Sequence, residues 1–124
     1  DNYNERRRNS AIRYSNNLKG INNITTPNIP SDSQSHVFHQ YTLRISDSKR
    51  DSLAEYLTKN SIPFGIYYPV PLHKQKAYYN HEVDNKLFPI TNNAVREVIS
   101  LPMHTELSIE QIDYISEKII KFLS

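Results

Sequence analysis

The chain of 124 residues has no cysteine and no tryptophan, and its only glycines are Gly20 and Gly65. Without cysteine it can form neither disulfides nor thiolate zinc sites, and it has no cysteine nucleophile. Two isolated glycines cannot build a glycine-rich phosphate-binding loop. No apolar run approaches the roughly 18 residues of a membrane-spanning helix. We therefore expect neither a disulfide scaffold nor a P-loop protein, and no membrane partner.

The charge balance argues against a nucleic-acid partner. Lys and Arg number 15 against 13 Asp and Glu, and the only dense basic run is residues 6–8. No aromatic residues are interleaved with that run, as a nucleic-acid surface would require. Five histidines are present, but His36 and His39 should point to opposite faces of a strand. The remaining histidines have no ligand spacing, so we expect no metal site.

Patterning in the first half predicts a helix, a connector and a strand. Residues 4–19 have helical periodicity, with Ala11, Tyr14, Ser15 and Leu18 on one face, and Gly20 suits the left-handed helix end. Residues 22–35 are rich in Asn, Thr, Ser and Pro and predict an irregular connector. Residues 36–45 alternate and predict a strand whose inner face holds Val37, His39, Tyr41, Leu43 and Ile45. We favour a buried structural role for His39.

The second half predicts alternating helices and strands. Asp47 or Ser48 should cap a helix with an apolar stripe of Leu53, Tyr56 and Leu57. The further elements predicted are a strand at residues 64–68, a helical turn at 75–80, a helix at 91–100 and an extended piece at 101–103. The last helix should start with a capping box of Ser108 and Gln111 and bury Ile109, Ile112, Ile115, Ile119 and Phe122. The order predicts an α+β fold, a small sheet covered by helices.

One irregular segment suggests a binding loop. Residues 65–75 (GIYYPVPLHKQ) join a strand end to a proline-stiffened loop carrying two Tyr, a His, a Lys and a Gln. Fixed proline dihedrals hold polar side chains in place at low entropic cost. Gly65 would allow a close approach by a ligand or another backbone. An aromatic core corner with a tight turn explains the same residues equally well.

Four stretches together resemble the DegT/DnrJ/EryC1/StrS family of nucleotide-sugar aminotransferases. They are residues 6–20, residues 36–41 (HVFHQY), the loop at 65–75, and residues 100–103 (SLPM) followed by 107–112 (LSIEQI). The resemblance covers nearly the whole chain in order. It implies the carboxy-terminal small domain of a fold-type I enzyme that uses pyridoxal 5'-phosphate (PLP). Residues 1–20 would be the helix from the large domain, 21–35 the connector and 36–124 the α+β core, with the PLP-binding large domain absent.

The resemblance also implies an activity. The parent enzyme would move an amino group from glutamate to a keto-sugar nucleotide, as a cytoplasmic homodimer. Its Schiff-base lysine lies in the large domain, so this chain supplies no catalytic residue, binds no PLP covalently and is inactive alone. The residues expected to bind substrate are Tyr67 first, then His73, with Tyr68 and Gln75 in support. Two alternatives stay open: a non-catalytic binding module, or a PLP-dependent sugar dehydratase of the same fold.

Finally, the first helix should brace the large domain in such an enzyme. We therefore expect its apolar face to be partly exposed in this chain, or covered by a second copy. The last helix should instead pack against the sheet formed by residues 36–45 and 64–68.

Overall fold

The computed structural model describes residues 2–32, 35–78 and 87–124. Its elements, in chain order, are α1 (Asn2–Asn17), β1 (Ile24–Thr25), β2 (Tyr41–Ile45), α2 (Arg50–Lys59), the short 3-10 helix η1 (Leu72–Lys74), α3 (Pro89–Glu97), β3 (Val98–Leu101) and α4 (Ile109–Leu123). The strands form one antiparallel sheet in the order β1-β2-β3, with Leu43 opposite Ile99. The predicted α+β class is confirmed.

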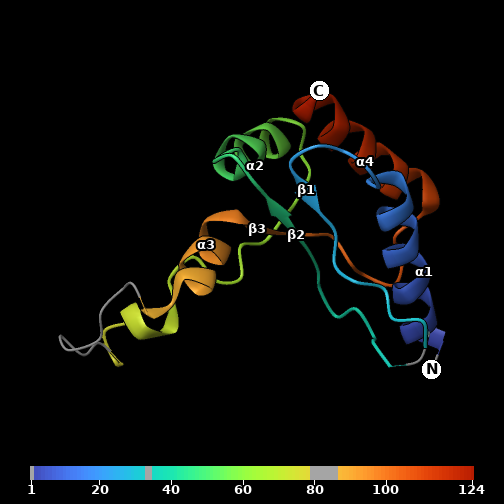
Figure 1. Cartoon of the computed structure of the whole chain (residues 1–124). Helices are drawn as coiled ribbons and strands as arrows, with labels where there is room; N and C mark the ends of the chain where they lie inside the picture. Colours follow the sequence, from blue (N-terminus) through green and yellow to red (C-terminus); the bar gives the residue numbers. More distant parts are fainter. Residues whose placement is uncertain (1, 33–34, 79–86) are drawn as a thin grey trace.

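A single core joins three helices to one face of the sheet. The middle strand β2 turns Tyr41, Leu43 and Ile45 inward, and all three are fully buried. Buried apolar residues of α1, α2 and α4 belong to the same cluster. Figure 1 shows these three helices grouped around the sheet, whereas α3 lies away from α1 and α4. This arrangement leaves the α3 end of the molecule outside the main core.

The last helix starts as predicted but buries a slightly different face. Ser108 and Gln111 form the capping box, in which Gln111 N–H donates to Ser108 Oγ over 3.2 Å. The buried residues are Ile112, Ile115, Ser116, Ile119 and Leu123. The prediction that Ile109 is buried is wrong, because this first helical residue is 59% exposed. Phe122 is half-buried and packs against Tyr56 of α2, with ring centroids 5.3 Å apart and the ring planes tilted by 37°.

The first helix contradicts our expectation of an exposed apolar face. Ala11, Tyr14 and Leu18 are buried within this one chain. The Tyr14 ring stacks on Tyr41 of β2 with centroids 5.1 Å apart, and Tyr41 Oη lies 2.8 Å from Ser15 Oγ. Burial raises the pKa of Tyr41 to about 12, so the phenol stays neutral at ordinary pH. The first helix is thus an integral part of the core. Gly20 has the expected left-handed conformation, with φ +77°.

The predicted strand at residues 36–45 is correct only in its second half. Phe38 takes a left-handed φ of 48°, and its N–H donates to His36 Nδ1 over 2.9 Å. This turn reverses the alternation, so Phe38 is buried while Val37 is 41% exposed. His39 is also exposed, which makes the predicted buried role for it wrong. The connector before it is not wholly irregular either, because β1 pairs with β2 there.

Three further boundaries differ from the prediction. Asp47 and Ser48 have left-handed φ values of 57°, and α2 begins after Lys49 with no side-chain cap, so the predicted cap is wrong. Residues 64–68 are not a strand, since only Gly65 bridges to Ser100. The helix predicted at 91–100 ends at Glu97, because Val98 and Ile99 enter β3. The short turn predicted at 75–80 extends beyond the described residues, and the structure places η1 just before it.

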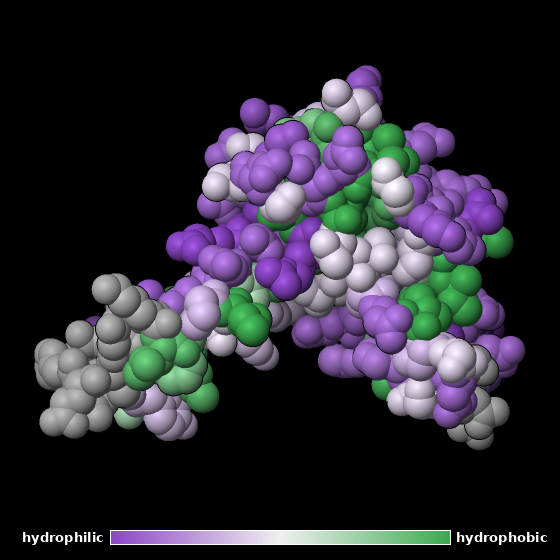
Figure 2. Space-filling model, viewed as in Figure 1, coloured by the Kyte–Doolittle hydropathy of each residue, from purple (hydrophilic) through white to green (hydrophobic). Residues whose placement is uncertain are grey.

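The segment around η1 and the start of α3 extends from the body and carries exposed apolar side chains. Figure 2 shows hydrophobic surface gathered at this end of the molecule. The exposed residues there are Leu72, Tyr78, Leu87, Phe88 and Ile90. None of the described helices is long and apolar enough to cross a bilayer.

Candidate functional site

A cavity of about 400 Å³ lies where the loop after α2 meets β3. Arg7 of α1 contributes to its wall, together with residues 39–40, 63–65 and 100–104, and with Tyr67. The wall therefore combines four segments that are distant in the sequence. It has apolar parts, contributed by Phe64, Leu101 and Met103, and several polar groups, but no carboxylate side chain. Such a mixture of apolar wall and few polar groups is typical of a small-molecule site.

Gly65 and Tyr67 shape one side of this cavity. Gly65 is held on β3, where its N–H donates to Ser100 O over 3.0 Å and its carbonyl accepts from Ser100 N–H over 2.7 Å. The Tyr67 ring folds back over this glycine, so that a Cβ at residue 65 would lie 2.6 Å from Tyr67 Oη. That distance is well inside van der Waals contact. The absence of a side chain at Gly65 thus gives Tyr67 its position, and the ring stays 47% exposed.

The wall of this cavity also carries hydrogen-bond donors. Arg7 comes from α1, His39 from the turn before β2 and His104 from the loop after β3. Arg7 differs from Arg6 and Arg13 of the same helix, which pair with Glu106 and Asp113. The Nε of Arg7 is buried and has no hydrogen-bond partner among the described residues. A guanidinium without a carboxylate partner beside an acid-free cavity favours a negatively charged ligand.

The structure does not gather all the residues predicted to bind substrate. Tyr67 lines the cavity. The Tyr68 ring contacts the Tyr67 ring edge-on, with ring centroids 5.8 Å apart, and Tyr68 is 70% exposed. His73 is absent from the cavity wall and stacks on Phe88, with centroids 4.6 Å apart. Its Nε2 is buried without a hydrogen-bond partner among the described residues. Gln75 is exposed near η1 and does not line the cavity.

Sequence reasoning missed Arg7, His39 and His104 as neighbours of Tyr67. The run at residues 6–8 resembled a solvated helix face, and His39 was expected inside. The reversal at Phe38 turns His39 outward, and no local pattern reveals it. Among the described residues, no three His, Asp or Glu side chains gather as metal ligands. His81 lies outside the described residues.

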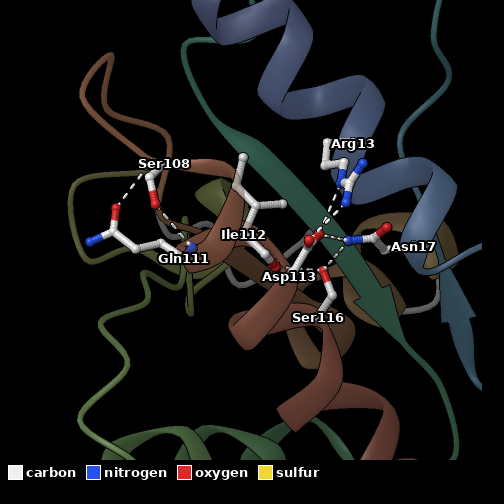
Figure 3. A network of polar contacts seen from close by, with 7 residues as sticks. All are labelled: Arg13, Asn17, Ser108, Gln111, Ile112, Asp113 and Ser116. Carbon is white, nitrogen blue, oxygen red and sulfur yellow. Dashed lines mark hydrogen bonds and ion pairs between the residues drawn. The ribbon is translucent and has the colours of Figure 1, made fainter.

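A polar network fixes α1, and with it Arg7, against α4. Arg13 donates to Asp113 through Nε to Oδ1 over 2.9 Å and through Nη2 to Oδ2 over 2.7 Å. Asn17 Nδ2 donates to Asp113 Oδ1 over 2.8 Å and to Ser116 Oγ over 3.3 Å. Figure 3 shows these side chains converging between the two helices. The hydrogen bond from Arg13 is the main cause that lowers the pKa of Asp113 to about 2.

The described lysines do not fit the role of a covalent cofactor anchor. A PLP enzyme holds its cofactor as an imine with a lysine amine. Five cavities formed by the described residues have no lysine in their walls. Lys74, the lysine nearest to the predicted loop, is exposed on η1. The described residues can therefore form part of a binding wall, but they do not provide a Schiff-base site.

Comparison with known proteins identifies the family. The chain belongs to the DegT/DnrJ/EryC1/StrS aminotransferase family, whose sequence profile matches residues 1–120. A pleiotropic regulatory protein of Geobacillus stearothermophilus is 37% identical over 98% of this chain. The dTDP-3-amino-3,6-dideoxy-alpha-D-galactopyranose transaminase of Aneurinibacillus thermoaerophilus is 35% identical, again over 98% of this chain. The chain spans only 32% of the length of either relative.

Solved structures confirm the fold. The crystal structure of S. venezuelae DesV in complex with a ketimine intermediate superimposes with a TM-score of 0.89 at 27% identity, covering 98% of this chain and 32% of that one. The PLP form of the sugar aminotransferase Spr1654 from Streptococcus pneumoniae gives a TM-score of 0.82 at 25% identity, with the same coverage of both chains. The present fold therefore corresponds to about a third of an aminotransferase chain.

Proposed function

We propose that this chain is the carboxy-terminal small domain of a PLP-dependent enzyme that transfers an amino group from glutamate to a keto-sugar nucleotide. The match to the aminotransferase family over residues 1–120 carries this proposal. It is supported by relatives named as nucleotide-sugar transaminases, of which this chain spans about a third. The remaining length would hold the large domain, as the sequence resemblance implies.

Within that enzyme, this chain contributes the part of the substrate wall centred on Tyr67. A phenol on a stiff ring suits sugar hydroxyls and phosphates because it donates a hydrogen bond at little entropic cost. Tyr67 is half-exposed in the cavity and is positioned by the bare backbone of Gly65. His73, Tyr68 and Gln75 belong to the same loop and would contact substrate parts outside this cavity, beyond Tyr67.

We assign the cofactor chemistry to the large domain that the family resemblance implies. PLP serves as an electron sink when it is bound to an enzyme, and it needs a lysine as anchor and a carboxylate at its ring nitrogen. We propose that the 124-residue chain alone is inactive and binds no PLP covalently, because the family resemblance implies that the Schiff-base lysine lies in the large domain. We further propose that the complete enzyme is a cytoplasmic homodimer, as in the family that the sequence resembles.

The deciding experiment uses the complete protein and follows its two half-reactions separately. The first half-reaction loads the amino group from glutamate, and the second delivers it to the keto-sugar nucleotide. We expect both to occur, with the cofactor's absorbance reporting each. Sugar turnover without amino transfer would instead indicate a dehydratase, and the absence of both reactions would indicate a non-catalytic binding module.

A further inference from the structure

The cavity beside Tyr67 contains a set of donors that none of the expected substrate-binding residues accounts for. Arg7, His39 and His104 line it, and no Asp or Glu does. Of the cavities formed by the described residues, those at the α1–α4 groove, beside Tyr114 and beside Ile12 each include a carboxylate in the wall. A fourth cavity, beside Phe38, also lacks a carboxylate, but its wall contains no arginine. The combination of an arginine with an acid-free wall is therefore found, among these cavities, at the Tyr67 site.

We propose that Arg7, His39 and His104 form an anion subsite that binds the phosphate oxygens of the sugar substrate. The inference rests on the proposed function and names the part of the substrate that this wall recognises. Arginine carries its charge at every physiological pH and its planar fork matches phosphate oxygens. An imidazole offers an N–H donor in both its neutral and its charged form.

Arg7 has no carboxylate partner among the described residues, and this is the main support for the proposal. Arg6, Arg13, Arg44 and Arg50 each have a carboxylate partner. Arg7 has none among the described residues, and its Nε is buried without a hydrogen bond. Leaving a buried donor unsatisfied is costly, so native structures seldom retain such a group without a partner or ligand. A phosphate in the adjoining cavity would give this guanidinium the anionic partner that the described residues do not supply.

The position of the subsite agrees with the substrate class. Tyr67 and the donors line the same cavity of about 400 Å³, a volume within the range of small-molecule sites. His39 and His104 are exposed and so accessible to a ligand. Phosphate bound at Arg7 would leave the phenol of Tyr67 free to contact another part of the same substrate. Both a nucleoside diphosphate and a sugar monophosphate carry the required oxygens.

Direct titration of the chain tests the proposal. We would add UDP, dTDP, glucose 6-phosphate and inorganic phosphate separately to the isotope-labelled 124-residue chain and follow the backbone amides by NMR. The expected result is saturable shifts at residues 39–40 and 100–104. Tighter binding of the two nucleotides would identify a diphosphate as ligand, and tighter binding of the hexose phosphate would identify a monophosphate. No shift in that wall with any of the four would overturn the proposal.

Substitutions on α1 provide a matched control. Arg7→Gln should raise the Kd for the best ligand by at least about tenfold, since a charge-assisted contact is lost. Arg6→Gln removes the same charge one residue earlier, outside the cavity wall, and should leave the Kd within about twofold. Arg7→Lys keeps the charge and should fall between them, which separates recognition from a failure to fold. Equal effects of Arg6→Gln and Arg7→Gln would contradict the subsite.

The subsite and the proposed function can fail independently. If the complete protein aminates a sugar nucleotide but Arg7→Gln leaves its KM for that substrate unchanged, the subsite is wrong and the function stands. If nucleotides bind through Arg7 but neither half-reaction occurs, the function is wrong and the subsite stands.

Discussion

Arg13 of α1 donates two hydrogen bonds, 2.9 and 2.7 Å long, to the carboxylate of Asp113 in α4. This contact, strengthened by Asn17, holds the pKa of Asp113 at about 2, below its ordinary value of 3.8. A carboxylate with a depressed pKa stabilises the fold above its unfolded-state pKa and loses that contribution as the pH falls through its folded-state pKa. The relevant window therefore runs from about pH 4 to about pH 2.

We predict that Asp113→Asn removes a part of the acid dependence of stability within that window. Thermal midpoints measured by circular dichroism should fall less steeply between about pH 4 and about pH 2 than in the original chain. The matched control is Glu117→Gln, which removes a carboxylate from an exposed position of the same helix. If Asp113→Asn and the original chain show the same pH profile, the Arg13–Asp113 contact is not formed in solution.

Gly65→Ala should disturb the site more than the fold. The new Cβ would overlap the outer atoms of the Tyr67 ring, which is half-exposed and can swing away at little cost. We expect the free energy of unfolding to change by less than about 1 kcal/mol, while nucleotide-sugar binding falls as much as in Tyr67→Ala. Denaturant melts and ligand titration check the two effects.

Gly20→Ala is the complementary control. Gly20 has open space around its Cα but a φ of +77°, so alanine there is strained without touching the site. It should cost about 1–2 kcal/mol of stability and leave binding unchanged. The account of Tyr67 fails if the two alanine variants show the same pattern of effects.

Two isoleucines of α4 test which face of the helix is buried. Ile119 is fully buried, so Ile119→Ala should destabilise the chain by about 2–5 kcal/mol. That is a large share of a typical domain stability of about 5–15 kcal/mol. Ile109 is 59% exposed, and Ile109→Ala should change stability by no more than about 0.5 kcal/mol. Equilibrium denaturation measures the change in unfolding free energy for each variant. A large destabilisation by Ile109→Ala would show that Ile109 is buried, as the sequence pattern predicted.

Sequence patterning predicted those parts of the fold that local rules govern. The capping box of Ser108 and Gln111 and the left-handed Gly20 depend on residues near one another in the chain, and both are confirmed. The family resemblance was also recognised from short stretches of sequence taken in their order along the chain, and the family match over residues 1–120 confirms it. Even in α4, however, the sequence pattern did not predict which residues are buried at the helix ends, because the packing against α1 and α2 determines them.

The parts of the fold that the sequence patterns failed to predict depend on contacts between residues far apart in the chain or on an unusual backbone conformation. Val98 and Ile99 fit a helical stripe, yet pairing with Arg44 and Leu43 of β2 draws them into a strand. Phe38 takes a left-handed φ that a bulky residue seldom adopts, and this inverts the apolar alternation before β2. The same reversal brings His39 to the cavity with Arg7 and His104, so the donor wall could not be read from the sequence.

The chain should not acquire PLP as a covalent adduct. We predict that incubation of the 124-residue chain with PLP, followed by borohydride reduction and mass mapping, gives no stoichiometric modification at a single lysine. The reason is that we expect the Schiff-base lysine in the large domain. In agreement, five cavities formed by the described residues have no lysine in their walls. Low, scattered labelling of surface lysines such as Lys74 is compatible with this account. A site-specific stoichiometric adduct would contradict the proposal that the Schiff-base lysine lies in the large domain.

The effect of Tyr67→Phe on the two half-reactions of the complete enzyme tests the central claim most directly. Loss of one neutral hydrogen bond costs about 0.5–1.5 kcal/mol, equivalent to a factor of roughly 2–13 in rate. We predict a loss of this size in the half-reaction with the keto-sugar nucleotide and little change in the half-reaction with glutamate. The reason is our proposal that Tyr67 contacts the sugar nucleotide. An equal loss in both half-reactions would contradict the claim and make Tyr67 a structural residue.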